Sequence, residues 1–162
     1  MNKIGKNVEI HQLAYIEDNV EIGDNTKIGP FCIVRKGAKI GNNCSFTAYC
    51  EIRENVVLGD GTTMGSRCTI SADATIGKNC VIGSGVIIKN TLIGDRVVLQ
   101  DNCKVGQKGF GFIPIKNQNI KFPHIGKVII NNDVEIASGC TIDRGSIDDT
   151  SIGSNTYLDN QV

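Results

Sequence analysis

Tryptophan is absent from this sequence, and aromatic residues make up only 5% of its 162 residues. The core must therefore be filled by small aliphatic side chains rather than built around large rings. Lysine plus arginine and aspartate plus glutamate number 17 each, so the formal net charge is zero, and nothing indicates binding to nucleic acid or an anionic membrane. Signal peptide and bilayer-length apolar run are both missing, which predicts a cytoplasmic protein without a membrane span.

A six-residue repeat dominates what is present. Every sixth residue from Ile4 to Ile88 is large and apolar, fifteen times in succession, and the next residue is often Gly. Two positions earlier a small or β-branched residue recurs. Because residues two apart lie on the same face of a strand, each hexad points one small and one large side chain inward. A period of six is typical of a hexapeptide solenoid.

The repeat predicts an all-β fold. Three short strands and three corners would close a triangular coil of roughly 18 residues, and about eight coils would stack at the ordinary strand spacing. The remaining hexad positions are Gly, Asn, Asp, Ser and Lys, which suit exposed corners with positive φ. We expect residues 1–162 to form a single solenoid domain, since no second globular domain fits.

Seven cysteines invite a disulfide or zinc interpretation, but their positions favour another one. Five occupy the small inward position of the hexad, and the two later ones take it again after the phase changes: Cys32, Cys44, Cys50, Cys68, Cys80, Cys103 and Cys140. No C-x-x-C pair is present. We therefore predict small buried residues with free thiols, no bound metal and no cofactor.

The repeat is interrupted at three places. The phase slips by one residue after Ile88, as a deletion at a corner would cause. Residues 107–127 form a longer interruption that contains Phe110, Phe112, Phe122 and His124. Insertions in solenoids project from one face and often build the functional site, so we expect an inserted loop with a role in binding. Packing of its Phe residues against the prism or a neighbouring subunit is compatible with that role.

A third interruption spans Asp143 to Thr150 and holds three carboxylates and Arg144 within seven residues. A solvated polar corner is the simpler interpretation, because charged turns are common. A polar pocket shared with the 107–127 loop is the alternative.

From Val105 to Val162 the sequence carries the segments GFGF, FPHIGKVII, DVEI, TIDRGSIDDT and LDNQV. In order and spacing these segments resemble the central part of the UDP-3-O-(3-hydroxyacyl)glucosamine N-acyltransferases of lipid A biosynthesis. The first ninety residues resemble the wider group of hexapeptide-repeat acyltransferases that act on sugar nucleotides.

The resemblance implies a left-handed parallel β-helix and a homotrimer with active sites in the clefts between adjacent prisms. It also implies the reaction, in which a 3-hydroxyacyl chain passes from acyl carrier protein to the 2-amino group of a UDP-linked, 3-O-acylated glucosamine. Acyl carrier protein and the UDP-sugar are thus the expected partners.

The resemblance also assigns candidate site residues. The family's catalytic His follows the D-N-Q motif in an I-A-H sequence that would lie beyond Val162, and Asp159 matches the residue that orients it. An imidazole suits this chemistry because the amine must lose a proton to attack a thioester. Substrate contacts are expected from Phe110, Phe112, His124, Asp143, Arg144, Asn160 and Gln161, whereas His11 is expected to be a surface residue.

Two departures from the family accompany these assignments. The repeat begins at Ile4, where the family has a separate uridine-binding domain, and the expected His is not among these residues. We therefore expect little acyl transfer from this chain alone. Another sugar-nucleotide N- or O-acyltransferase, or an inactive truncated trimer, remain as alternatives. A trimeric carbonic anhydrase would need three His per site where only two exist, and an ice-binding solenoid would need a regular outward Thr ladder.

Overall fold

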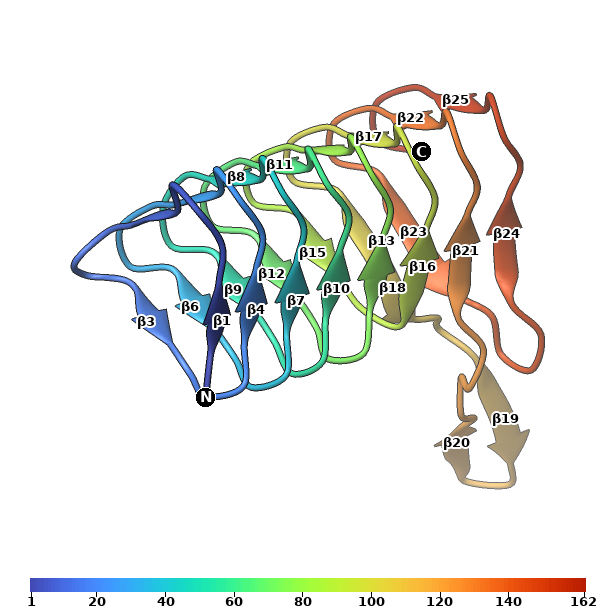
Figure 1. Ribbon diagram of the computed structural model, residues 1–162. Helices are drawn as coiled ribbons and strands as arrows, with labels where there is room; N and C mark the ends of the chain where they lie inside the picture. The colour runs from blue at the N-terminus through green and yellow to red at the C-terminus, as the bar shows by residue number, and fades with distance from the viewer.

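The computed structural model describes residues 1–162, and every regular element in it is a strand (Figure 1). Three parallel sheets form the sides of a triangular prism. Sheet A contains β1 (Lys3–Ile4), β4 (Glu21–Ile22), β7 (Lys39–Ile40), β10 (Val57–Leu58), β13 (Thr75–Ile76), β16 (Thr91–Ile93), β21 (Val128–Ile130) and β24 (Thr150–Ile152). Sheet B contains β2 (Glu9–Ile10), β5 (Lys27–Ile28), β8 (Ser45–Phe46), β11 (Thr63–Met64), β14 (Val81–Ile82), β17 (Val98–Leu99), β22 (Glu135–Ile136) and β25 (Tyr157–Leu158).

Sheet C contains β3 (Tyr15–Ile16), β6 (Ile33–Val34), β9 (Glu51–Ile52), β12 (Thr69–Ile70), β15 (Ile87–Ile88), β18 (Lys104–Lys108) and β23 (Thr141–Arg144). The chain visits sheets A, B and C in turn and winds as a left-handed parallel β-helix (Figure 1). The predicted fold class is therefore confirmed. Its hand is opposite to that of ordinary parallel crossovers.

Successive coils are in register because the repeat is 18 residues long. Lys3 pairs with Glu21 and Ile4 with Ile22, and the same offset recurs along all three sheets. At the predicted phase slip the offset shortens by one residue, so that Ile76 pairs with Ile93. Equivalent hexad positions therefore stack into ladders that run the length of the prism.

The prism interior is a single cluster of 32 buried apolar residues. Both predicted inward positions fill it, the large one through residues such as Ile52, Ile70 and Leu99, and the small one through residues such as Val20 and Val86. Ile, Val and Cys dominate because the narrow interior of one coil has no room for larger rings. Phe46 is the one buried aromatic residue.

The seven cysteines are all buried with free thiols, as predicted. The structure adds a reason for their position. The thiol of Cys68 donates to the backbone carbonyl of Gly83 at 2.9 Å, 15 residues ahead on the next coil, and Cys50 donates likewise to Gly65 at 3.0 Å. Thr62 holds the equivalent place on another edge and donates to Gly77 at 2.9 Å. These small residues therefore satisfy corner carbonyls as well as filling space.

Corners take up positive φ at regular intervals, as the composition predicted. Asn7, Asn25 and Asn43 adopt φ of 54°, 56° and 55°, and their side-chain amides form a hydrogen-bonded ladder. Two aromatic residues adopt the same conformation, which was not expected of bulky side chains. Phe31 and Tyr49, both at φ 58°, stack with ring centroids 4.8 Å apart on the edge where sheet B leads into sheet C.

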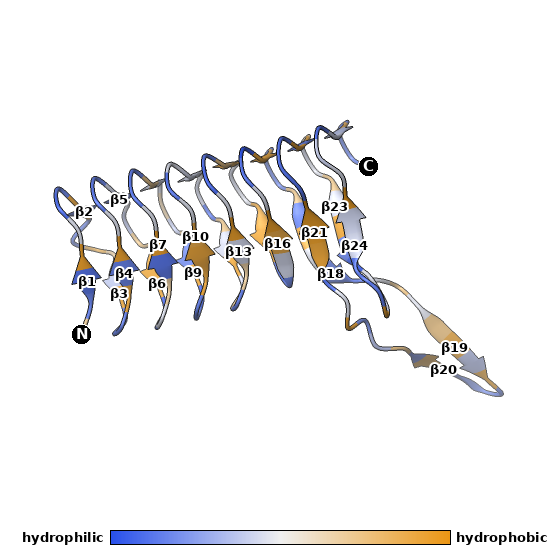
Figure 2. Ribbon diagram, turned by 45° about the vertical axis from the view of Figure 1, so that its right-hand side comes forward, coloured by the Kyte–Doolittle hydropathy of each residue, from blue (hydrophilic) through white to orange (hydrophobic).

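The 107–127 interruption contains regular structure of its own. After β18 the chain forms an antiparallel hairpin of β19 (Phe112–Ile115) and β20 (Gln118–Lys121). The hairpin projects from the edge where sheet C leads into sheet A, called the C–A edge below, near the last coils (Figures 1 and 2). The structure contains no helix long and apolar enough to cross a membrane.

Candidate functional site

The two polar interruptions of the repeat meet at the C–A edge. The amide of Ile125 donates to the carbonyl of Ser146 at 2.9 Å, and that of Gly126 donates to Gly145 at 3.1 Å. Asp149 completes the junction by accepting the Lys127 amide at 2.7 Å through Oδ1. The base of the hairpin and the 143–150 segment are therefore joined by backbone and side-chain hydrogen bonds.

Glycine is required where these segments touch. A Cβ on Gly126 or on Gly145 would stand inside contact distance of the Asp148 carbonyl oxygen. A larger residue at Gly126 would push the two segments apart, and one at Gly145 would distort the 143–150 segment itself. The sequence signal was the pair of Gly residues, but nothing in the repeat indicated that they face each other.

His124 is enclosed at the base of the hairpin, with 7% of its surface exposed. A Cβ on Gly109 would come within 2.6 Å of its Nε2, so the imidazole fits only because that position is glycine. The Phe122 ring packs beside it with centroids 5.6 Å apart. Phe110 and Phe112, by contrast, lie on the outside of the hairpin in an edge-to-face pair 4.6 Å apart, and Phe110 is 86% exposed.

Arg144 ends β23 beside Lys108 of β18. Its Nε is buried, and no acceptor of the chain bonds it. An unsatisfied buried donor costs about 1–3 kcal/mol, so an arginine in this state calls for an explanation. Its neighbour Asp143 is exposed and uses its backbone carbonyl to accept the Thr150 hydroxyl at 2.8 Å.

Three of the other four arginines, Arg35, Arg53 and Arg96, have carboxylate partners. Arg35 bonds Glu17 at 2.8 Å and Glu51 at 3.4 Å on successive coils, and Arg96 bonds Asp133 through two nitrogens. The hydrogen bond from Arg35 holds the pKa of the Glu17 carboxyl below its usual value. Arg144 forms no such pair, although three carboxylates lie close to it in the sequence.

Asp159, Asn160 and Gln161 form an exposed corner after β25. Asp159 Oδ1 accepts both the amide and the side-chain Nδ2 of Asn160, at 2.7 and 3.2 Å, whereas its Oδ2 accepts no hydrogen bond within the chain. Asn160 in turn accepts the Ser138 amide at 3.1 Å, and Gln161 takes a φ of 58°. The corner is thus tied to the previous coil and leaves one carboxylate oxygen free.

The Asp159 corner and the hairpin base lie at opposite ends of one strand. The Cys140 thiol, at the start of β23, donates to the Asp159 carbonyl at 3.0 Å, and Arg144 ends the same strand. Four residues of strand span about 13 Å. The structure therefore brings His124, Asp143 and Arg144 together at the C–A edge. Asp159, Asn160 and Gln161 lie at the opposite edge of sheet C.

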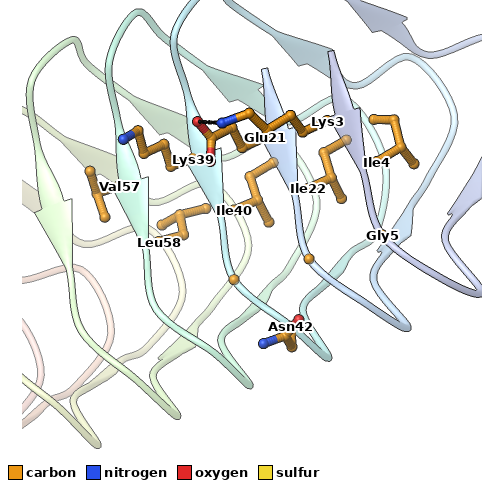
Figure 3. A pocket seen from close by; sticks show the side chains of 12 residues that line it. Lys3, Ile4, Gly5, Glu21, Ile22, Lys39, Ile40, Asn42, Val57 and Leu58 are labelled. Carbon is orange, nitrogen blue, oxygen red and sulfur yellow. Dashed lines mark hydrogen bonds and ion pairs between the residues drawn. The ribbon is translucent and has the colours of Figure 1, made fainter. Parts of the chain in front are cut away.

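Two hollows on the first coils lie far from these residues. One of about 410 Å³ on sheet A is lined by Ile4, Ile22, Ile40 and Leu58 with the Lys3–Glu21 ion pair at its rim (Figure 3). Its one carboxylate, that of Glu21, is held in the ion pair with Lys3 at 3.1 Å. His11 borders the other hollow, on sheet B, and is exposed as expected, with its Nδ1 facing the Leu13 amide at 3.2 Å.

Comparisons with known proteins find one matching family model and several similar proteins. The family described as bacterial transferase hexapeptide (six repeats) matches residues 3–36, 20–54 and 55–90. A UDP-3-O-acylglucosamine N-acyltransferase of Rhodopseudomonas palustris is 51% identical over 81 residues, and one of Nitrobacter hamburgensis is 49% identical over 81 residues. These alignments cover 50% and 49% of this chain but only 22% of each relative.

Solved structures share the fold at low sequence identity. AntD, an N-acyltransferase from Bacillus cereus in complex with dTDP and coenzyme A, matches with a TM-score of 0.59 at 21% identity, over 74% of this chain and 83% of its own. The acetyltransferase domain of PglB from Neisseria gonorrhoeae matches with a TM-score of 0.58 at 18% identity, over 60% of this chain and 48% of its own.

Proposed function

Because this chain belongs to the bacterial transferase hexapeptide family, we propose that it forms the solenoid of an N-acyltransferase acting on a sugar nucleotide. The observation that carries the proposal is the 51% identity, over half of the chain, to a protein named UDP-3-O-acylglucosamine N-acyltransferase. The substrate we propose is accordingly a UDP-linked, 3-O-acylated glucosamine with a free 2-amino group. The acyl donor is a 3-hydroxyacyl thioester of acyl carrier protein.

The reaction requires little beyond binding and one proton transfer. The amine attacks the thioester carbon and loses a proton, the tetrahedral intermediate collapses to an amide, and the thiol of the donor leaves. A histidine is the base best matched to this step near neutral pH. We assign Asp159 the role of positioning that imidazole, because its free Oδ2 is exposed and its Oδ1 is fixed by Asn160.

We place the substrate along the part of sheet C that β23 forms, between the Asp159 corner and the hairpin base. This part of the sheet spans about 13 Å. Phe110, Phe112, Asn160 and Gln161 are exposed around it and would contact substrate. A second copy of the prism would close the open side of this cleft, as in a homotrimer.

In this proposal residues 1–162 act as one domain and residues 107–127 as its binding insertion. The seven free thiols suit a reducing compartment, so we place the reaction in the cytoplasm. The reaction needs no metal or cofactor, because the thioester already supplies the activated acyl group.

The test is an acyl transfer assay on the chain extended through the I-A-H segment of the family, because the expected base is not among residues 1–162. It should be incubated with a 3-hydroxyacyl thioester of acyl carrier protein and the UDP-3-O-acylglucosamine, with the product identified by mass spectrometry as the 2-amide. Asp159→Asn should lower kcat by at least about tenfold with little change in KM. It should also shift the acidic limb of the pH profile, because that limb reports the protonation of the imidazole that Asp159 positions.

The matched control is Asp148→Asn, which removes an exposed carboxylate of the 143–150 segment whose side chain bonds nothing in the chain. It should leave kcat unchanged. Transfer to a hydroxyl, or faster transfer from an acyl coenzyme A to a different sugar nucleotide, would instead assign the chain to another branch of the same family. An Asp159→Asn enzyme with an unaltered pH profile would contradict the positioning role.

A further inference from the structure

The base of the hairpin gathers cationic side chains that form no ion pair within the chain. Arg144 and Lys108 are neighbours on β23 and β18, and neither forms an ion pair within the structure. The Arg144 Nε is buried without an acceptor. A guanidinium presents five donors in a planar fork, and here the fork has no partner.

The nearby carboxylates do not meet this need. Asp149 accepts the Lys127 amide through Oδ1. Asp143 and Asp148 are exposed and form no hydrogen bond with Arg144. The local charge is balanced, with Lys108, Lys127 and Arg144 set against these three carboxylates. Attraction of an anion must therefore come from directed donors rather than from a positive field.

His124 lies on the segment that adjoins the strands carrying these donors. The amide of the following residue, Ile125, bonds Ser146 two positions after Arg144, while Gly109, next to Lys108, contacts the imidazole. His124 is buried, and neither of its ring nitrogens makes a hydrogen bond within the chain. Three nitrogen-bearing side chains without a hydrogen-bond partner in the chain thus lie on adjoining segments at the base of the hairpin.

We infer that Arg144, Lys108 and His124 form a phosphoryl-binding subsite at the base of the hairpin. Arginine pairs with phosphate oxygens through two parallel hydrogen bonds, and lysine adds a point charge. The inference rests on the proposed function for its ligands, since both substrates would carry such a group: the diphosphate of a sugar nucleotide and the phosphodiester of a phosphopantetheine thioester. The geometry itself specifies only the shared chemistry.

Isothermal titration calorimetry of the protein with inorganic pyrophosphate, UDP and pantetheine 4′-phosphate tests the inference and separates the two sources. Pyrophosphate should bind, and Arg144→Gln should raise its dissociation constant by about tenfold or more. The same loss with UDP but not with pantetheine phosphate assigns the subsite to the sugar nucleotide, and the reverse assigns it to the acyl donor. Arg67→Gln, which removes an exposed arginine from another edge, is the matched control and should bind as the unaltered protein does.

Histidine NMR gives a readout that does not depend on the variant folding. The chain has two histidines, so pyrophosphate should shift the ring resonances of His124 and leave those of His11 in place. Arg144→Lys, which keeps the charge and loses the fork, should show weakened binding with the same His124 shift. Unchanged affinity in Arg144→Gln, no pyrophosphate binding by the unaltered protein, or equal shifts at both histidines would overturn the inference. No acyl transfer is involved, so the inference stands or fails separately from the catalytic assignment.

Discussion

At the scale of single residues, the small inward position does two things. It fills the interior, and on two of the three edges it also donates to a corner carbonyl of the next coil. On the C–A edge the same position is occupied by residues such as Val20, Ala38 and Val56, which have no side-chain donor. The corner carbonyl there accepts instead the backbone amide of the residue three positions later, as the Arg35 carbonyl accepts the Ala38 amide at 3.3 Å. Cysteine and threonine are thus interchangeable donors, and valine is not.

This equivalence predicts the outcome of two near-isosteric substitutions at Cys68. Cys68→Thr keeps a donor for the Gly83 carbonyl, whereas Cys68→Val leaves that partly buried acceptor unpaired. We expect the Val variant to be less stable than the Thr variant by about 1–2 kcal/mol. Urea unfolding of both proteins measures the difference.

A substitution at Val56 provides the control, because the neighbouring inward residues of its edge, Ala38 and Ala74, carry no thiol or hydroxyl. Val56→Thr should be no more stable than the unaltered protein, since the corresponding carbonyl, that of Ser71, already accepts the Ala74 amide. A Cys68→Val protein as stable as Cys68→Thr would show that packing alone explains the cysteines.

The thiols also predict how stability depends on pH. Burial raises the pKa values of Cys44, Cys80 and Cys103 above the ordinary value of the unfolded chain, about 8.5. The stabilisation they give is therefore full below pH ~8.5 and is lost as the pH rises toward the folded-state values. Above that pH the free energy of unfolding should fall by up to about 1.4 kcal/mol per pH unit for each thiol.

Urea titrations between pH 7 and pH 10 check this slope. In the double variant Cys44→Thr, Cys80→Thr the slope should be shallower, because Thr26 and Thr62 already occupy equivalent places on the same edge. An equal slope in the two proteins would mean that other groups cause the alkaline loss.

At the scale of elements, the hairpin is attached to the prism through glycine contacts. Gly126→Ala places a methyl group against the Asp148 carbonyl and should separate the hairpin base from the 143–150 segment. We expect a loss of about 1–3 kcal/mol confined to this junction. Trypsin should then cleave faster after Lys116, Lys121 and Lys127, while the circular dichroism of the prism stays unchanged.

Gly153→Ala is the matched control for this prediction. The nearest atom to its new methyl group is the Thr156 hydroxyl at 4.0 Å, in ordinary contact. Its cleavage rate should equal that of the unaltered protein. Equal rates for Gly126→Ala would show that the two segments are not held together by this contact.

The elements also differ in how far the sequence predicts them. The coils were predictable because one 18-residue period places every inward side chain, so that Cys103 and Cys140 could be assigned even after the phase changes. The hairpin was not, because Ile113 to Ile120 is a local antiparallel pair with its turn at Lys116, outside the period. The enclosure of His124 depends on Gly109 and Phe122, which only the folded hairpin brings together.

At the scale of the whole molecule, the hairpin leaves apolar surface uncovered. Ile113, Ile115 and Ile120 are 51%, 45% and 44% exposed, beside the fully outward Phe110. Contiguous exposed apolar surface usually marks an interface. We predict a homotrimer, with a mass by light scattering three times the 17.4 kDa of one chain.

Replacing the exposed pair Ile113→Asn, Ile115→Asn should shift the light-scattering mass toward the monomer without unfolding the coils. Val57→Asn and Val81→Asn, at exposed positions of sheets A and B, serve as controls of similar polarity change. A monomer mass for the unaltered protein at micromolar concentrations would contradict the prediction.

The 18-residue offset between paired strands of the first coils has an evolutionary consequence. Removing residues 37–54, one complete turn, would join Lys36 to Asn55 with every ladder still aligned, because the residues of each sheet recur at that offset. Duplication or loss of such a unit alters the length of the molecule while leaving the last turns intact. Lineages descended by unequal recombination could thus vary in length and retain their chemistry, which makes the number of turns a poor guide to kinship.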